Sequence, residues 1–253
     1  MVSAYMKKNI YTSLFSLAIL GLMIATLTTP WYVWDNTFSL RLFDDTLNPS
    51  SGMSSVATTS TLNQTTIVYD LIGFRTITQR SGSKAKVQSY KSHTLADMPS
   101  VTAIFRVCTA FVLITLILSL TVSIFQLIFL NEYIRNKFLF LVGMSNFRIA
   151  LLAASVLIVF STVIALLALL GISTAFKLEQ PVCSEGPCRD FSSSVTSVFD
   201  DGPIKSVTRW GPDAGWYITL ASIPLSIVLL FFVASNRFPL PAIDDGVYSG
   251  EAI

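Results

Sequence analysis

The chain has 253 residues, of which 52% are hydrophobic and only 13% are charged, with a formal net charge of +2 and a mean hydropathy of +0.63. A soluble domain carries about a quarter charged residues, so this composition excludes an ordinary water-soluble protein. The small net charge and the absence of a basic run exclude nucleic acid as a partner.

Four apolar stretches predict an α-helical membrane protein, a left-handed bundle of four transmembrane helices in the lipid bilayer. Each stretch matches the roughly 20 helical residues that cross a bilayer core, and none has a charged residue in its middle. The first lacks an Ala-x-Ala cleavage site, which favours a retained helix over a cleaved signal peptide. The predicted spans are residues 10–29, 101–130, 149–174 and 215–235.

Basic residues beside the helix ends predict the orientation, because they favour the cytoplasmic side of the membrane. They fall on one side of the predicted topology: Lys7, Lys8, Arg135, Lys137, Arg148 and Arg237. We therefore expect residues 1–9, 131–148 and 236–253 to be cytoplasmic. Residues 30–100 and 175–214 are then extracellular loops, and the plasma membrane is the expected location.

Two tryptophans follow the first span within Pro30-Trp-Tyr-Val-Trp34. Tryptophan favours the lipid–water interface, where its ring is half buried and its N–H stays in contact with water. We expect Trp31 and Trp34 to be structural anchors of this kind, and together with Arg106 to join the sheet to the helices. Contact between this segment and a partner protein is the alternative.

The first outer loop is predicted to form an antiparallel sheet of three to five strands. Phe38–Phe43 alternates with period two, and further β-prone runs are separated by glycine and serine turns. The polar stretch 48–66 predicts a mobile loop that carries Asn63, the acceptor of an Asn-Gln-Thr glycosylation sequon. The chain's one histidine, His93, lies in a polar stretch without a second histidine, so we expect it to be solvated and not a metal ligand.

Arg106 is the charged residue at the outer edge of the second span. Its guanidinium can snorkel to the lipid headgroups, or it can tie the helix to the outer sheet through hydrogen bonds. Both interpretations make Arg106 structural. Cys108, two residues further along, is expected to be a small buried residue.

The second outer loop contains Cys183 and Cys188, separated by Ser-Glu-Gly-Pro. An extracellular location and a Gly-Pro turn favour a small ring closed by a disulfide, and two free thiols are the alternative. The β-prone runs Ser193–Phe199 and Ile204–Trp210 predict a hairpin. Because an isolated hairpin is marginal in water, we expect it to join the sheet of the first loop.

The C-terminal tail ends in Glu251-Ala-Ile253. A tail with this sequence and a free C-terminal carboxylate can add as a strand to a PDZ-type groove. This suggests a cytoplasmic scaffold as a partner. Three-residue tails of this kind occur often by chance.

No catalytic motif, metal-ligand set or cofactor-binding motif is present, so we expect neither an enzyme nor a cofactor. The spans also lack the ionisable midplane residues and repeated helix breaks that are typical of transporters. Pro224 is expected to kink the fourth span. The search for function therefore moves to the outer loops.

The layout resembles the superfamily of claudins, peripheral myelin proteins and calcium-channel gamma subunits. Trp31 after the first helix, Arg106 at the outer start of the second, and Gly215-Trp216 entering the fourth are similar to residues of that family. The family's Gly-Leu-Trp motif followed by two cysteines is absent, because the first loop holds no cysteine. The resemblance implies four transmembrane helices with both chain termini in the cytoplasm, and a β-rich extracellular layer above them.

We therefore expect a non-enzymatic protein that acts through this β-layer in membrane assembly, adhesion or modulation of a membrane complex. Its expected partners are other membrane proteins or further copies of itself, with Phe199 and the Phe38–Phe43 strand as candidate contacts. The alternative is a subunit of an oligomeric channel or pore. Its lining would come from Thr115, Ser119, Ser161 and Thr162.

Overall fold

The computed structural model describes residues 4–42, 58–80, 86–92, 98–128, 130–131, 134, 144–179, 186–198 and 204–235. Its helices are α1 (Ala4–Thr28), α2 (Pro99–Ile128), α4 (Met144–Leu170), α5 (Ile172–Glu179) and α6 (Ala214–Ser235). Four of them, all except α5, are long and apolar enough to cross a membrane. Helices of this kind indicate an integral membrane protein, and their positions match the four predicted stretches.

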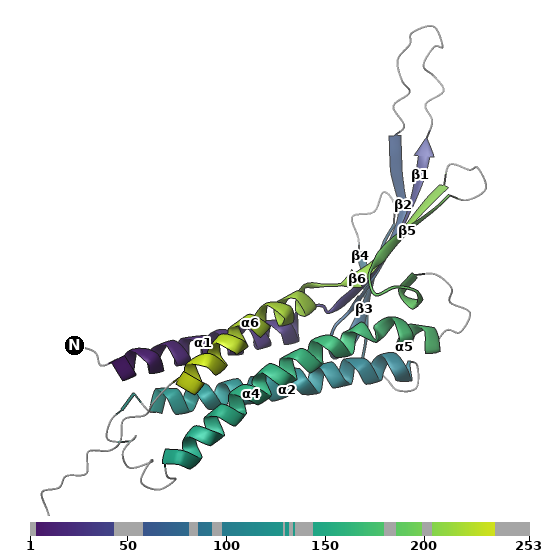
Figure 1. The fold of residues 1–253 in the computed structure, drawn as a ribbon. Helices are drawn as coiled ribbons and strands as arrows, with labels where there is room; N and C mark the ends of the chain where they lie inside the picture. Colours follow the sequence, from purple (N-terminus) through teal and green to yellow (C-terminus); the bar gives the residue numbers. More distant parts are fainter. Residues whose placement is uncertain are drawn as a thin grey trace, which may run out of the picture.

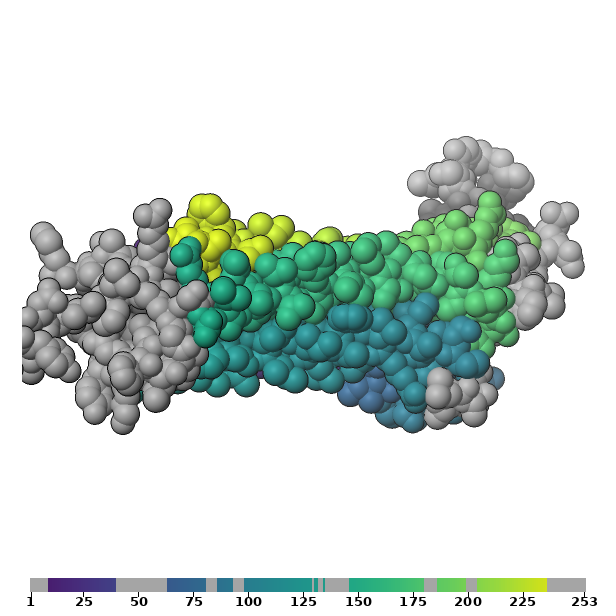
Figure 2. Space-filling model, turned by 60° about the horizontal axis from the view of Figure 1, so that its bottom comes forward, coloured from purple at the N-terminus to yellow at the C-terminus, as the bar shows by residue number. Residues whose placement is uncertain are grey.

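The four long helices form one bundle. α1 packs between α2 and α6, and α4 contacts the same two helices from the other side. Figure 2 shows α4 and α2 lying side by side along one face of the bundle. The ends of the bundle differ, because the sheet lies at one end and the start of α1 at the other (Figure 1). A left-handed crossing of the helices stays a prediction.

The interior of the bundle is more polar than its surface. Large apolar side chains such as Leu14, Ile117 and Phe160 are exposed, whereas hydroxyl side chains are buried between the helices. Ser16 of α1 donates to the backbone oxygen of Ser119 on α2 at 2.8 Å, and Ser123 donates to Ser16 at 2.9 Å. Small polar residues at helix contacts and apolar residues toward the surroundings are typical of helices packed in lipid.

The six strands form a single antiparallel sheet in the order β4-β3-β2-β1-β6-β5. The first loop supplies four of them and the second loop supplies the β5–β6 hairpin, which joins the first loop's sheet as predicted. The strands are β1 (Tyr32–Leu42), β2 (Thr58–Tyr69), β3 (Gly73–Arg80), β4 (Lys86–Ser92), β5 (Ser193–Val198) and β6 (Ile204–Pro212).

Two local predictions need correction. Asn63 lies within β2, paired with Phe38 of β1 and Arg80 of β3, so the sequon is in a central strand and not in a mobile loop. The register shifts next to this position, between Phe38 and Ser39. A further helix, α5, starts within the predicted third span and continues into the predicted second loop, where no helix was expected.

Candidate interaction site: the outer sheet and its joint with the helices

Trp31 lies at the joint between α1 and the sheet, and each of its polar groups bonds to a different element. Its indole N–H donates to the backbone oxygen of Thr26 in α1 at 3.0 Å. Its backbone N–H donates to the oxygen of Tyr69 at 2.8 Å, and its own oxygen accepts from the N–H of Asp213 at 3.0 Å. Trp31 therefore fixes α1, β2 and the start of α6 relative to one another.

The bond to Thr26 follows from the sequence. The oxygen of Thr26 would normally accept the N–H four residues later, but that residue is Pro30, which has none. The indole of Trp31 replaces the missing donor. Its side chain is 0% exposed, so the expectation of a half-buried ring at the lipid–water interface is wrong for Trp31. Trp34, by contrast, is partly exposed, and its buried indole N–H has no hydrogen-bond partner.

Gly215 allows this close packing. A Cβ atom at Gly215 would lie 2.5 Å from Cδ1 and 2.7 Å from Nε1 of Trp31, and 3.0 Å from the backbone oxygen of Pro30. The N–H of Gly215 donates to that same Pro30 oxygen at 2.7 Å. The absence of a side chain at residue 215 therefore lets α6 start directly against Trp31.

An aromatic cluster joins the sheet to the helices beside Trp31. Tyr69 stacks on Phe105 of α2 at a ring distance of 5.9 Å and meets Phe176 of α5 edge-on at 5.7 Å. Tyr32 contacts Phe176 at 6.1 Å, and its hydroxyl donates to the backbone oxygen of Phe191 at 3.1 Å. The cluster consists of Tyr32, Tyr69, Phe74, Phe105, Phe176 and Phe191.

Burial in this cluster raises the pKa of both tyrosines well above the usual value, and for Tyr32 the neighbouring Tyr69 raises the pKa further. Both hydroxyls therefore stay protonated at physiological pH. Tyr32 in particular remains a hydrogen-bond donor to Phe191. The cluster holds the near end of the sheet on α2 and α5.

Beyond the cluster the sheet is a single layer that extends past the helices (Figure 1). Residues 33–38 of β1 are partly exposed on both faces. Polar side chains connect the strands there. The carboxylate of Asp35 accepts from Gln64 at 3.2 Å and Thr66 at 2.9 Å, and the side-chain oxygen of Asn36 accepts from Ser206 at 3.1 Å.

The two edges of this layer differ in charge. All seven residues of β4 are exposed, and this strand carries Lys86 and Lys91. β5 has five exposed residues out of six and carries no charge. An uncharged edge strand is open to pairing with another chain, whereas edge lysines oppose such pairing. This contrast depends on strand order, which local sequence patterns do not reveal.

The structure separates the predicted contact strand from these edges. β1, which includes residues 38–42 of the predicted Phe38–Phe43 strand, lies between β2 and β6. From Tyr32 to Leu40 its backbone is paired on both sides, so this part of the strand can meet a partner only through its faces. Phe43, Phe199 and His93 lie outside the described residues.

The remaining predicted site residues are dispersed. Arg106 is exposed on α2 beside the β2–β3 turn. Cys188 is buried at the end of a short 3-10 helix, Gly186–Cys188, which begins with Gly186 at a φ of 75°. Cys108 is a free, buried cysteine. Cys183, Glu251 and Ile253 lie outside the described residues.

The four residues proposed to line an oligomeric pore face the inside of one bundle. Thr115, Ser119, Ser161 and Thr162 are at most 4% exposed. The hydroxyls of Thr115, Ser119 and Thr162 donate to backbone oxygens one turn earlier in their own helices. Side chains placed this way cannot line a channel formed between subunits in this conformation, so the channel alternative gains no support.

Models of known protein families do not match the chain, and a search of curated proteins finds no match either. The resemblance to claudins and their relatives therefore stays a prediction from the residues quoted above.

Proposed function

We propose that this protein is a non-enzymatic, four-pass membrane protein that assembles laterally through its outer sheet. The observation that supports this most is β5, an uncharged and exposed edge strand on a sheet that extends beyond the bundle. A second copy of the chain, or the edge strand of another membrane protein, can add to β5 by backbone hydrogen bonds. The lysines of β4 disfavour the same pairing at the opposite edge.

We propose that the sheet is extracellular and that the protein resides in the plasma membrane. Lys7 and Lys8 lie in α1 at the end of the bundle away from the sheet. Arg148 lies at that end too, where it donates to the backbone oxygen of Ala234 near the end of α6 at 3.2 Å. Basic residues gathered at one end support a cytoplasmic location for that end.

This orientation supports two modifications. Cys188 is proposed to pair with Cys183, since the left-handed Gly186 provides the turn that such a short ring needs. Non-reducing mass spectrometry of residues 178–189 tests this, and two free thiols would contradict it. Asn63 is proposed to carry a glycan, and unchanged gel migration after deglycosylation would contradict that.

The proposed membership of the claudin-like superfamily is supported by layout. The first loop contributes most of the sheet, and Trp31 and Gly215 meet at the joint between the first and fourth spans. Membership would make assembly through the sheet a property shared with the family. The C-terminal Glu251-Ala-Ile253 is proposed separately, from its own residues, to bind a PDZ-type cytoplasmic scaffold. The solution structure of a natural complex would decide whether β5 is the contact.

Placing a lysine on β5 is expected to disperse the assembly. In an antiparallel β5–β5 pairing, Thr196→Lys brings two like charges close together near the centre of the contact. Like charges at this spacing are destabilising, and we expect self-association to weaken about fivefold or more. Light scattering of the detergent-solubilised full chain, together with crosslinking in native membranes, measures this.

Gln88→Lys is the matched control, because it places the same charge at the centre of the β4 edge. It is expected to leave both the crosslinked species and the measured mass unchanged. Loss of assembly with Gln88→Lys but not with Thr196→Lys would place the contact at the β4 edge and contradict the proposed contact at β5. If neither variant alters any complex, assembly through a sheet edge is contradicted.

A further inference from the structure

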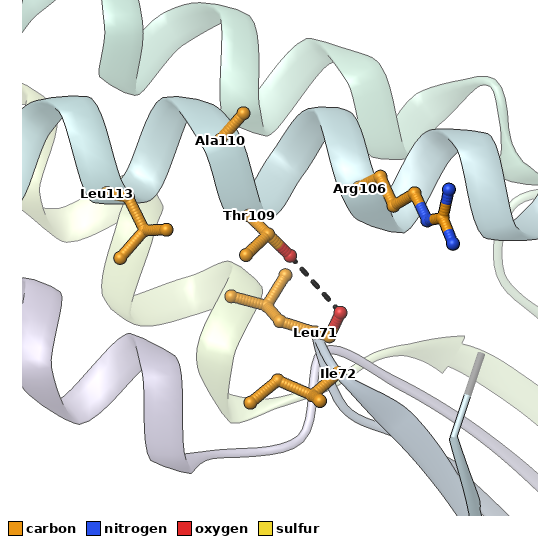
Figure 3. A pocket seen from close by; sticks show the side chains of 6 residues that line it. All are labelled: Leu71, Ile72, Arg106, Thr109, Ala110 and Leu113. Atoms are coloured by element: carbon orange, nitrogen blue, oxygen red, sulfur yellow. Dashed lines mark hydrogen bonds between the residues drawn. The ribbon is translucent and has the colours of Figure 1, made fainter.

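A groove lies between the β2–β3 turn and the outer part of α2. It has a volume of about 360 Å³ and is lined by Leu71, Ile72, Arg106, Thr109, Ala110 and Leu113. Figure 3 shows Leu71 beside Thr109 of the helix and Ile72 next to Leu71 on the turn, with Arg106 at one end of the groove and Leu113 at the other. The lining is apolar except at the Arg106 end and at the hydroxyl of Thr109.

The walls of the groove are held in place by hydrogen bonds. The Thr109 hydroxyl donates to the backbone oxygen of Leu71 at 3.1 Å and to that of Phe105 at 2.7 Å. The turn is closed by the N–H of Asp70, which donates to the oxygen of Gly73 at 2.8 Å. The groove is therefore part of the folded structure and not a gap between independent segments.

The nearby acidic side chains are already engaged. The carboxylate of Asp70 forms an ion pair with Arg75 at 3.1 Å. Glu179 accepts a hydrogen bond from the N–H of Ser100, at the start of α2. Arg106 itself is exposed and forms no ion pair with any residue in the described parts of the chain. Its positive charge is therefore available to a ligand.

The polarity of the groove follows the direction of the membrane normal. Thr109 is level with Leu71, and Arg106 lies three residues, about 4.5 Å, closer to the sheet. Leu113 lies four residues, about 6 Å, deeper into the bundle. Ile72 is 64% exposed at the tip of the turn, where an apolar side chain favours lipid over water. The charged end therefore faces the headgroups and the apolar end faces the hydrocarbon.

We propose that this groove binds one phospholipid of the outer leaflet. Arg106 binds the lipid phosphate, for which the planar guanidinium offers two parallel N–H donors. One acyl chain lies along Ala110 and Leu113, covered by Ile72. The site depends on α2 crossing the membrane and is independent of assembly through β5.

Native mass spectrometry of the delipidated full chain in detergent tests this with dioleoyl phosphatidylglycerol as the probe. We expect one tightly retained lipid per chain. Arg106→Gln is expected to weaken its binding about tenfold or more, because it removes a charge-assisted hydrogen bond. Dioleoylglycerol, which lacks the phosphate, should bind more weakly by a similar factor. Inorganic phosphate should not compete.

Two pairs of variants separate this site from general lipid adhesion. Ala110→Trp fills the groove and should reduce lipid binding. Leu120→Trp places the same ring on an exposed, deeper part of α2 and should leave lipid binding unchanged. Arg209→Gln removes an exposed arginine from the sheet and should change nothing. Equal binding by Arg106→Gln and the unmodified chain would overturn the proposal, as would equal losses in Ala110→Trp and Leu120→Trp. Competition by inorganic phosphate would also overturn it, because it would identify the groove as a site for a free anion and not for a phospholipid.

Discussion

Replacing Trp31 with alanine is expected to lower the free energy of unfolding by about 3–5 kcal/mol, the usual cost of removing a fully buried tryptophan. Trp31→Phe keeps most of the ring but removes the indole N–H. The oxygen of Thr26 then has no donor, because Pro30 cannot supply one, and we expect a cost of about 1–3 kcal/mol. The effect is large because one side chain joins α1 to the sheet.

Trp34→Phe is the matched control for Trp31→Phe. The indole N–H of Trp34 is buried without a hydrogen-bond partner, so its removal leaves no other group unsatisfied. We expect Trp34→Phe to change stability little or to increase it. Thermal unfolding of the detergent-solubilised chain, followed by near-UV circular dichroism, compares the two. Equal losses of stability in both variants would show that the hydrogen bond between Trp31 and Thr26 does not stabilise the fold.

Gly215→Ala is expected to destabilise the protein by about 1–3 kcal/mol, as overpacking of a filled interior does. The added methyl group would lie 2.5 Å from the Trp31 ring and 3.0 Å from the backbone oxygen of Pro30. The ring is fully buried and hydrogen-bonded, so it cannot move aside without loss. Relief of the clash requires α6 to shift away from the joint.

Gly21→Ala provides the opposite expectation with the same chemical change. Nothing lies within 4 Å of a Cβ atom at Gly21, in the middle of α1. Alanine is the better helix former, so stability should stay equal or rise by up to about 1 kcal/mol. The same unfolding experiment applies. A tolerated Gly215→Ala beside a damaging Gly21→Ala would contradict the packing described at the joint.

The helices were predictable because long uncharged apolar stretches have few alternatives in a chain of this composition. The joining of both loops into one sheet was also predictable, since the β5–β6 hairpin cannot bury enough surface alone. Both conclusions depend on bulk physical requirements. They do not depend on the details of any single side chain.

One error arose where long-range pairing overrides local preference, and the other where a local hydrogen bond was overlooked. The segment around Asn63 is polar enough for a loop, yet it forms β2 because β1 and β3 pair with it on both sides. Trp31 was predicted at the lipid interface. Its indole instead turns inward and donates to the oxygen of Thr26, because Pro30 has no N–H to donate there. The position of Trp31 could have been predicted from the sequence, because Pro30 lies four residues after Thr26 and cannot donate to its oxygen.

The candidate site was predictable only as a region. The sequence places recognition in the outer loops, but the strand order that puts β5 and β4 at the edges comes from the fold. Arg106 was singled out as a lone charge. Its groove partners Leu71 and Ile72 come from a turn more than 30 residues away, which no local pattern connects to α2.

Labelling of single cysteines in intact cells tests the central claim, that the bilayer separates the sheet from the C-terminal tail. Ser89→Cys lies on exposed β4 and Ser249→Cys in the C-terminal tail, and the unmodified chain gives the background. We predict that an impermeant maleimide labels Ser89→Cys at once and Ser249→Cys only after permeabilisation. Equal labelling of both before permeabilisation would contradict the membrane topology and the proposed role of the sheet.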